Sequence, residues 1–236
     1  MENTVLKDIG TTYGKGAPWH DRLLTLFALG QERRLRREMA KRLGLKPGDT
    51  VVDLACGTGL NFEALEGAVG PEGRIIGVDY SPDMLAQARK RIEKRGWRNI
   101  ELIRGDAADF GLSESVDAAV CTLAMGLFPD RRRLLKRMMS AVKPGGRVLI
   151  ADGKLSERWY GLLLNPLLRW LGSPWIPPSM RGAYWGGKPW KELEELIGQV
   201  GYEEYLWGTV YAAYGTVPRK ESDEREREQS STMHSS

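Results

Sequence analysis

Two acidic residues and two glycines lie at the ends of consecutive apolar segments in the first third of the chain. Asp53 belongs to the β-branched run 51–54, and Gly57 and Gly59 follow it in an Asp-x-x-x-Gly-x-Gly spacing. Asp79 ends the next apolar run. Glycines at a strand end let the backbone turn sharply and let a ligand approach the main chain. An acid at a strand end can accept both hydroxyls of a ribose. This pattern predicts a pocket for a nucleotide-like ligand.

The segments that must position these residues are typical of a strand, a glycine turn and a helix. The run 51–54 favours a buried strand, and the helix-compatible segment 62–65 follows the glycines. A dinucleotide fingerprint requires a third glycine in Gly-x-Gly-x-x-Gly, and that position holds Phe62. The missing glycine counts against a dehydrogenase-like or non-catalytic dinucleotide module.

Further blocks follow in a fixed order. Residues 100–104 predict a strand that leads into Gly105-Asp106-Ala107, and 116–120 predict a strand that reaches Thr122. A Lys-Pro-Gly-Gly turn at 143–146 then leads into a strand over 148–151. With these blocks in order, residues 45–153 resemble the class I S-adenosylmethionine-dependent methyltransferases. The first motif of that family is an acid followed by Gly-x-Gly, and its second is the ribose-binding acid.

The resemblance implies a fold, a methyl donor and a set of donor-binding residues. The fold is an α/β, Rossmann-like, seven-stranded and mostly parallel sheet with helices on both faces and an antiparallel last strand. The donor is S-adenosylmethionine, the product S-adenosylhomocysteine, and no metal is expected. Asp53 would lie near the donor's ammonium group, Asp79 at the ribose, and Asp106 at the adenine amino group. The implied donor site comprises Asp53, Ala55, Gly57, Thr58, Gly59, Asp79, Tyr80, Asp106, Ala107 and Thr122.

Methyl transfer from a sulfonium is an in-line displacement that needs alignment and exclusion of water more than a nucleophile or a metal. The sequence has no motif for either. The first 20 residues contain Tyr13, Trp19 and His20, which we expect to close the site in the manner of the family. His20 could take a proton from the acceptor because its ordinary pKa lies near neutrality, although a lone histidine is more often structural. Tyr13 and His20 are thus the candidate catalytic residues.

Composition and charge pattern predict the domain organisation. We expect an N-terminal helical cap over 1–44, a methyltransferase domain over 45–217 and a disordered tail over 218–236, which has no apolar face to bury. Within the domain, 155–189 forms an apolar insertion or lid, rich in Leu and Trp and broken at Asn165-Pro166. The arginines of the helix expected over 22–43 form a solvated face or a basic face for anionic lipid. They are Arg33, Arg34, Arg36 and Arg37.

The remaining helices and strands have clear boundary signals. Ser81-Pro82 predicts a capped helix start and Gly96 its end, and Pro129-Asp130 opens the next helix. A last helix is expected over 190–200, followed by a hairpin around Gly208. The only cysteines, Cys56 and Cys121, lack a paired spacing and are interpreted as reduced thiols. Reduced thiols indicate a cytoplasmic protein, and a net charge of +4 permits peripheral contact with the anionic inner face of the membrane.

The acceptor is the least specified part of the prediction. The opening residues and the Leu/Trp-rich insertion more loosely resemble the ubiquinone/menaquinone C-methyltransferases and the bacterial phosphatidylethanolamine N-methyltransferases. We favour a hydrophobic or lipid-like acceptor and N-methylation of a phospholipid amine headgroup. Quinone C-methylation and O- or N-methylation of a natural product are the alternatives. RNA is less favoured because the tryptophans lie among leucines and prolines rather than lysines.

Overall fold

The structure is a computed structural model that describes residues 30–173, 176, 177, 180 and 184–219, with the isolated residues 8, 12 and 21. Most of the expected N-terminal cap lies outside the described residues, and so do Tyr13, Trp19 and His20. The expected tail lies outside them from position 220 onward. The roles suggested for these segments therefore stay predictions.

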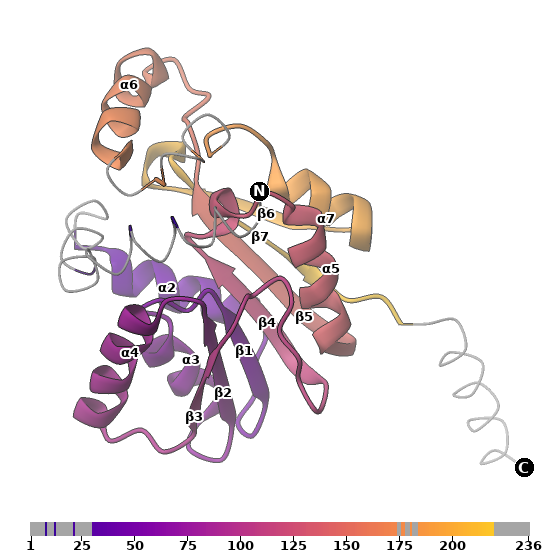
Figure 1. The fold of residues 1–236 in the computed structure, drawn as a ribbon. Coiled ribbons are helices and arrows are strands. Elements are labelled where there is room, and N and C mark those ends of the chain that lie inside the picture. Colours follow the sequence, from indigo (N-terminus) through magenta and orange to yellow (C-terminus); the bar gives the residue numbers. More distant parts are fainter. Residues whose placement is uncertain are drawn as a thin grey trace, which may run out of the picture.

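A seven-stranded sheet forms the centre of the described chain, with strand order β3-β2-β1-β4-β5-β7-β6 (Figure 1). The strands are β1 (Thr50–Leu54), β2 (Arg74–Asp79), β3 (Ile100–Arg104), β4 (Val116–Thr122), β5 (Val142–Gly153), β6 (Gly201–Tyr205) and β7 (Val210–Thr216). Neighbours from β3 to β5 pair in parallel, whereas β7 runs antiparallel to both β5 and β6. The predicted mostly parallel sheet with an antiparallel last strand is confirmed.

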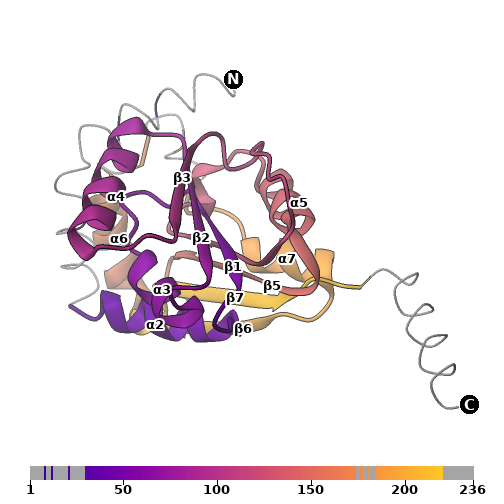
Figure 2. The same cartoon turned by 90° about the horizontal axis from the view of Figure 1, so that it is seen from below.

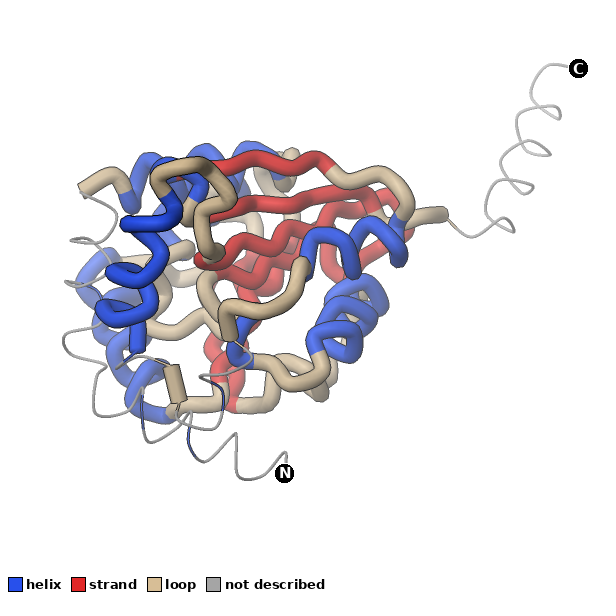
Figure 3. The backbone as a smooth tube through the Cα atoms, turned by 90° about the horizontal axis from the view of Figure 1, so that it is seen from above, coloured by secondary structure: helices blue, strands red, loops and turns tan. Residues whose placement is uncertain are grey.

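Helices cover both faces of this sheet (Figures 2 and 3). They are α2 (Glu32–Arg42), α3 (Phe62–Val69), α4 (Pro82–Arg95), α5 (Arg131–Ala141) and α7 (Pro189–Ile197). The remaining helix, α6 (Gly161–Gly172), projects away from the sheet (Figure 1). Successive strand side chains alternate between two apolar clusters, as in β1, where Val51 packs with α2, α3 and α4 and Val52 packs with α5 and α7. The strands are buried on both faces because each face carries a layer of helices.

The predicted helix boundaries have the expected caps. The Ser81 hydroxyl accepts a hydrogen bond from the Met84 backbone N–H, and Gly96 ends α4 in the left-handed conformation with φ of 70°. The Asp130 carboxylate accepts one from the Arg133 backbone N–H at the start of α5. Each cap satisfies a backbone group that the helix leaves without an internal partner.

Three strand and helix boundaries differ from the prediction. In the described part of the helix expected over 22–43, α2 begins only at Glu32, because Gly30 takes a φ of +75°. β5 begins at Val142 rather than at 148, because the Lys-Pro-Gly-Gly turn bulges out between two paired stretches: Val142 pairs with Val116, and pairing resumes with Arg147 opposite Ala118. α7 ends at Ile197, where Gly198 takes a φ of +81°, instead of continuing to 200.

The expected break at Asn165-Pro166 is wrong, since Pro166 lies inside α6. Proline removes the N–H that would bond the carbonyl of Leu162. That turn lies on the surface, where water can hydrate the freed carbonyl, and Leu162 is 86% exposed. The Asn165 side chain also clamps the helix to the preceding loop, accepting from the Ser156 N–H and donating to the Ser156 carbonyl at 2.8 and 2.9 Å.

Candidate functional site

The Asp79 carboxylate joins the ends of β1 and β2. One of its oxygens accepts a hydrogen bond from the Gly57 N–H and the other accepts one from the Ser81 N–H, each at 2.8 Å. These bonds hold the glycine turn after β1 against the carboxyl end of β2. A carboxylate has about four lone-pair sites, so it can accept several hydrogen bonds at once.

A cavity of about 810 Å³, counting its open mouth, lies over these strand ends. Eight of the ten predicted donor-site residues line it: Ala55, Gly57, Thr58, Asp79, Tyr80, Asp106, Ala107 and Thr122. The residues come from the ends of β1, β2, β3 and β4, which meet at one edge of the sheet. In an open α/β sheet this edge is where ligands bind.

The two glycines have different roles. Gly57 has a φ of +56° and open space where a side chain would begin, so a ligand can approach its backbone. Gly59 does not line the cavity. With a φ of +76°, its added Cβ would lie 2.4 Å from the Phe62 ring, so this glycine permits the tight packing of the turn on α3.

Two non-glycine residues at this edge adopt the left-handed backbone conformation. They are Ala55, after β1, with a φ of 53°, and Leu123, after β4, with a φ of 57°. Such conformations are costly for residues with a side chain and cluster at functional sites. The Leu123 N–H is held by the Ala151 carbonyl of β5 at 2.7 Å. Both strained residues line the cavity.

Asp53 lies behind the cavity wall and is fully buried. Its Oδ1 accepts from the Asn61 side chain at 2.9 Å, and its Oδ2 has no hydrogen-bond partner among the described residues. Burial raises the pKa of Asp53 to about 7, although the Asn61 hydrogen bond and the positive charge of Arg36 oppose this. A buried carboxylate oxygen without a partner is suited to a cationic ligand group.

Arg36 is the exception to the solvated arginine face that was predicted for α2. Arg33, Arg34 and Arg37 are exposed, whereas Arg36 is buried and bonds Glu32 at 2.6 Å. The Arg36 guanidinium also donates to Asn61 and to the Thr122 hydroxyl. Sequence reasoning missed this role. Helical spacing could have shown it, because Arg36 shares a face with the buried Met39 and Ala40.

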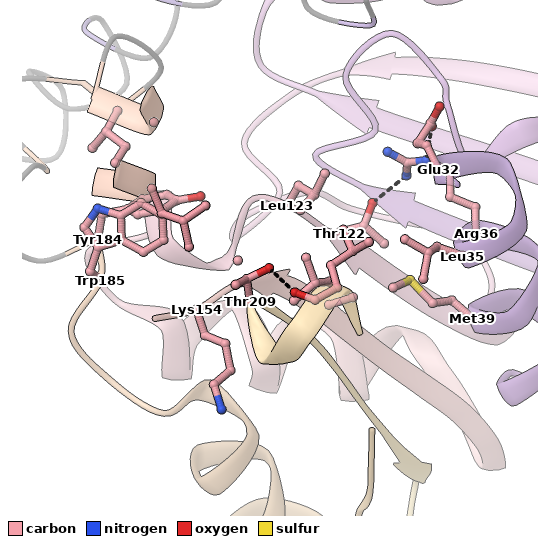
Figure 4. Close-up of a pocket in the computed structure, with 17 residues that line it drawn as sticks. Glu32, Leu35, Arg36, Met39, Thr122, Leu123, Lys154, Tyr184, Trp185 and Thr209 are labelled. Atoms are coloured by element: carbon pink, nitrogen blue, oxygen red, sulfur yellow. Dashed lines mark hydrogen bonds and ion pairs between the residues drawn. The ribbon is translucent and has the colours of Figure 1, made fainter. Parts of the chain in front are cut away.

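A second cavity of about 1160 Å³, counting its mouth, adjoins the first (Figure 4). Arg36, Thr122 and Leu123 line both cavities. Most of its other lining side chains are apolar and come from α2, α6 and the segments around β5 and β7. They include Leu35, Met39, Leu168, Ile176, Trp185 and Leu206. Thr122, predicted to line the methyl side, thus lies where the two cavities meet.

Lys154 lines the second cavity, but its ammonium group points away from the centre (Figure 4). It donates to Glu204 and to the Tyr202 hydroxyl and lies 5.5 Å from the Trp190 ring centroid. Burial lowers the pKa of Lys154, but the hydrogen bonds to Glu204 and Tyr202 outweigh burial and leave the pKa above its ordinary value. The charge is therefore neutralised outside the cavity.

Asp106 has both the predicted position and a structural role. Its carboxylate accepts from the Ala108 N–H at 2.8 Å, which closes the turn after β3, and the residue lines the first cavity.

Cys56 and Cys121 are buried free thiols. Among residues 30–173 and the other described positions, no three His, Cys, Asp or Glu side chains are grouped to hold a metal ion.

Comparison with known proteins assigns the class. A methyltransferase domain family matches residues 51–146. Demethylmenaquinone methyltransferase of Lactobacillus johnsonii is 35% identical over 150 residues, which are 62% of this chain and 61% of that protein. The chain spans about three fifths of the length of the curated relatives it matches, with 61% and 65% for two of them.

Solved structures show the same fold. A SAM-dependent methyltransferase from Aquifex aeolicus superposes with a TM-score of 0.58 at 21% identity, over 77% of this chain and 89% of that one. Haemonchus contortus phosphoethanolamine N-methyltransferase 2, in complex with S-adenosyl-L-methionine, gives 0.62 at 17% identity, over 79% and 53%. Residues 51–146 thus match a methyltransferase domain, and the solved structures share its fold. Together with the relatives, these findings support a class I S-adenosylmethionine-dependent methyltransferase.

Proposed function

We propose that this protein transfers a methyl group from S-adenosylmethionine to an apolar, quinol-type ring held in the second cavity. The observation that carries the proposal is the large apolar cavity that meets the strand-edge cavity at Thr122 and Leu123. When bound, the donor supplies a methyl group already activated on a sulfonium. The chain's own residues align the two molecules and keep water out.

The first cavity fits the donor at two of its lining residues. Gly57 leaves its backbone open to a ligand, and Asp79 presents an anchored carboxylate to a ribose. Asp53 is not among the lining residues, and it has a buried oxygen without a partner among the described residues. The last feature suits the ammonium group of the donor's amino-acid part. Asp106 and Ala107 line the same cavity and are proposed to hold the adenine edge.

The charges of the second cavity favour a neutral ring over an amine. Its charged lining residues are Glu32, Arg36 and Lys154. Glu32 is the acidic one, and it already pairs with Arg36. Among the described residues that line this cavity, no carboxylate is thus left to face an ammonium group. The curated relatives named demethylmenaquinone methyltransferase support the same preference.

A phospholipid amine, the acceptor that the sequence favoured, is the second candidate. Tyr184 and Trp185 line the cavity with their rings edge to face at 4.9 Å between centroids. Aromatic faces of this kind attract alkylammonium groups. The amine therefore belongs in the test of the proposal.

The test is transfer of a labelled methyl group from S-adenosylmethionine to three acceptors in parallel. They are a demethylated naphthoquinol with a short isoprenoid chain, phosphatidylethanolamine in vesicles, and total RNA. We expect label in the naphthoquinol fraction. Label only in the amine lipid would replace our proposal with the second candidate, and label only in RNA would exclude both. Glu66→Gln on α3, outside both cavities, serves as the active control variant.

The outer surface of α6 supports a membrane-associated role. Five large apolar side chains on or beside this helix are 50–86% exposed, namely Trp159, Leu162, Leu163, Leu167 and Trp170. Leu168 and Gly172 of the same helix line the second cavity. Arg158 and Arg169 are exposed beside the apolar residues. We infer that α6 lies at the interface of an anionic bilayer and leads an apolar acceptor into the cavity. No helix of the described residues is long and apolar enough to cross a bilayer.

The variant Leu162→Ser with Trp170→Ser tests this surface. Both side chains are more than two-thirds exposed, at 86% and 70%, so the fold should tolerate the change. Burying each side chain in the interface contributes about 1–2 kcal/mol, so binding to anionic vesicles should fall about tenfold or more in cosedimentation. Ala86→Ser, on the exposed face of α4, is the control. Unchanged vesicle binding in the double variant would remove α6 from the interface.

A further inference from the structure

Tyr184 lies in the wall between the second cavity and a smaller one. It lines the large apolar cavity and also a cavity of about 300 Å³ whose lining includes Asp152, at the end of β5. Its hydroxyl points toward the middle of the large cavity in the view of Figure 4. The same hydroxyl lies 3.3 Å from Oδ1 of Asp152. One phenol thus contacts both the proposed acceptor space and a buried carboxylate.

Asp152 is held in place by the backbone around it. Its Oδ2 accepts from the Gly126 N–H at 2.8 Å, and its Oδ1 accepts from the Gly153 N–H at 2.7 Å. The carboxylate is 2% exposed. Gly126 also fixes the tyrosine, because a Cβ at this position would lie 2.7 Å from the Tyr184 ring. The Gly126 backbone thus contacts both side chains: its N–H bonds the Asp152 carboxylate, and its missing Cβ leaves room for the Tyr184 ring.

We propose that Tyr184 is the catalytic residue that takes the acceptor's proton, and that Asp152 accepts the proton which Tyr184 gives up. The proposal rests on the proposed function, because it requires an acceptor hydroxyl in the second cavity. A base is needed there because methylation of a quinol ring releases one proton. A side chain in this role must lie within hydrogen-bond reach of the proton and of its own proton acceptor.

The step balances as follows for a quinol ring. The hydroxyl proton moves to the Tyr184 oxygen while the Tyr184 proton moves to Oδ1 of Asp152. The electron pair of the ring carbon forms the bond to the methyl carbon, and the carbon–sulfur pair returns to sulfur. The proton on the methylated ring carbon then moves to the ring oxygen and restores the hydroxyl. One proton is released in total, and the Asp152 carboxyl holds it.

Asp152 is expected to titrate between pH 5 and pH 8, whereas the buried Cys121 and Tyr211 near it are not. Burial raises the pKa of Asp152 to about 6, against the hydrogen bonds from Gly126, Gly153 and Tyr184. Burial also raises the pKa values of Cys121 and Tyr211 well above their ordinary values, so both stay neutral between pH 5 and pH 8. Five titratable or charged groups face Asp152. They are Cys121 of β4, Arg131 of α5, Lys154 after β5, Tyr211 of β7 and Tyr184 before α7.

The test compares Tyr184→Phe, Asp152→Asn and wild type in single-turnover methyl transfer between pH 5 and pH 9. In wild type the rate should rise through an apparent pKa of about 6, because Asp152 must be deprotonated to accept the proton. Tyr184→Phe should lower the rate about a hundredfold and leave the dissociation constant of S-adenosylmethionine unchanged. Asp152→Asn should also remove the rise near pH 6.

Tyr160→Phe is the matched control, because the Tyr160 hydroxyl bonds the Trp207 carbonyl outside both cavities. It should behave as wild type. If Asp152→Asn does not fold, Tyr184→Phe still decides, since it removes one oxygen and keeps the ring on Gly126. A Tyr184→Phe rate within twofold of wild type, with the same pH profile, would overturn the proposal. Absence of transfer in wild type, with donor binding intact, would instead refute the proposed acceptor.

Discussion

Asp79→Ala is expected to weaken the binding of S-adenosylmethionine by about a hundredfold or more. The Asp79 carboxylate is fixed at the cavity wall by the Gly57 and Ser81 N–H groups and is proposed to accept both ribose hydroxyls. Hydrogen bonds to a charged group contribute about 1.5–3 kcal/mol each, and 1.4 kcal/mol corresponds to about a factor of ten. The variant also releases the glycine turn from the end of β2.

Isothermal titration calorimetry with S-adenosylmethionine measures this effect, with Asp83→Ala as the control. Asp83 is exposed in the first turn of α4, four residues away, and does not line the first cavity. Asp79→Asn separates the two roles of the carboxylate: it keeps one acceptor oxygen and should lie between wild type and alanine. Donor affinity unchanged in Asp79→Ala would show that the ribose assignment is wrong.

The elements that sequence reasoning placed correctly are those with local signals. Ser81 and Pro82 start α4, and Gly96 ends it, because caps and backbone conformations depend on a few neighbouring residues. The strands β1 to β4 follow from short apolar runs that both faces of the sheet must bury. The family resemblance added the order of the blocks and hence the edge of the sheet where the first cavity forms.

The features that the sequence did not reveal depend on contacts between distant segments. Pro166 stays inside α6 because that turn faces solvent and Asn165 anchors it to Ser156. Arg36 is buried because Asn61 and Thr122, far along the chain, supply its acceptors. The same holds for the candidate proton path, since only the fold brings position 184 next to the end of β5.

Asp53→Asn is expected to stabilise the ligand-free protein at pH 8. The pKa of Asp53 is raised to about 7, from an ordinary value of 3.8, chiefly by burial. The folded state therefore binds the proton more tightly than the unfolded state does. The free energy of unfolding therefore falls by at most about 4 kcal/mol as the pH rises from about 4 to about 7. Above pH 7 this contribution is constant. Asparagine has no such charge to bury, so its advantage should appear at pH 8 and vanish at pH 4.

Thermal unfolding of both proteins at pH 4 and pH 8 measures the effect. Asp109→Asn, whose side chain is 75% exposed, is the control and should change little at either pH. The Asn61 amide can still donate to position 53, and Arg36 keeps Glu32 as its counter-ion, so the surrounding hydrogen bonds survive the change. A lower melting temperature than wild type at pH 8 would contradict the expectation.

The same variant should bind S-adenosylmethionine at least about tenfold more weakly at pH 8, since a neutral amide cannot balance the donor's ammonium charge. A variant that gains stability and loses donor affinity together would identify Asp53 as a charge kept buried for binding rather than for folding. That outcome would also explain why one of its oxygens has no partner among the described residues. Gain of stability with full donor affinity would move the ammonium group to another part of the cavity.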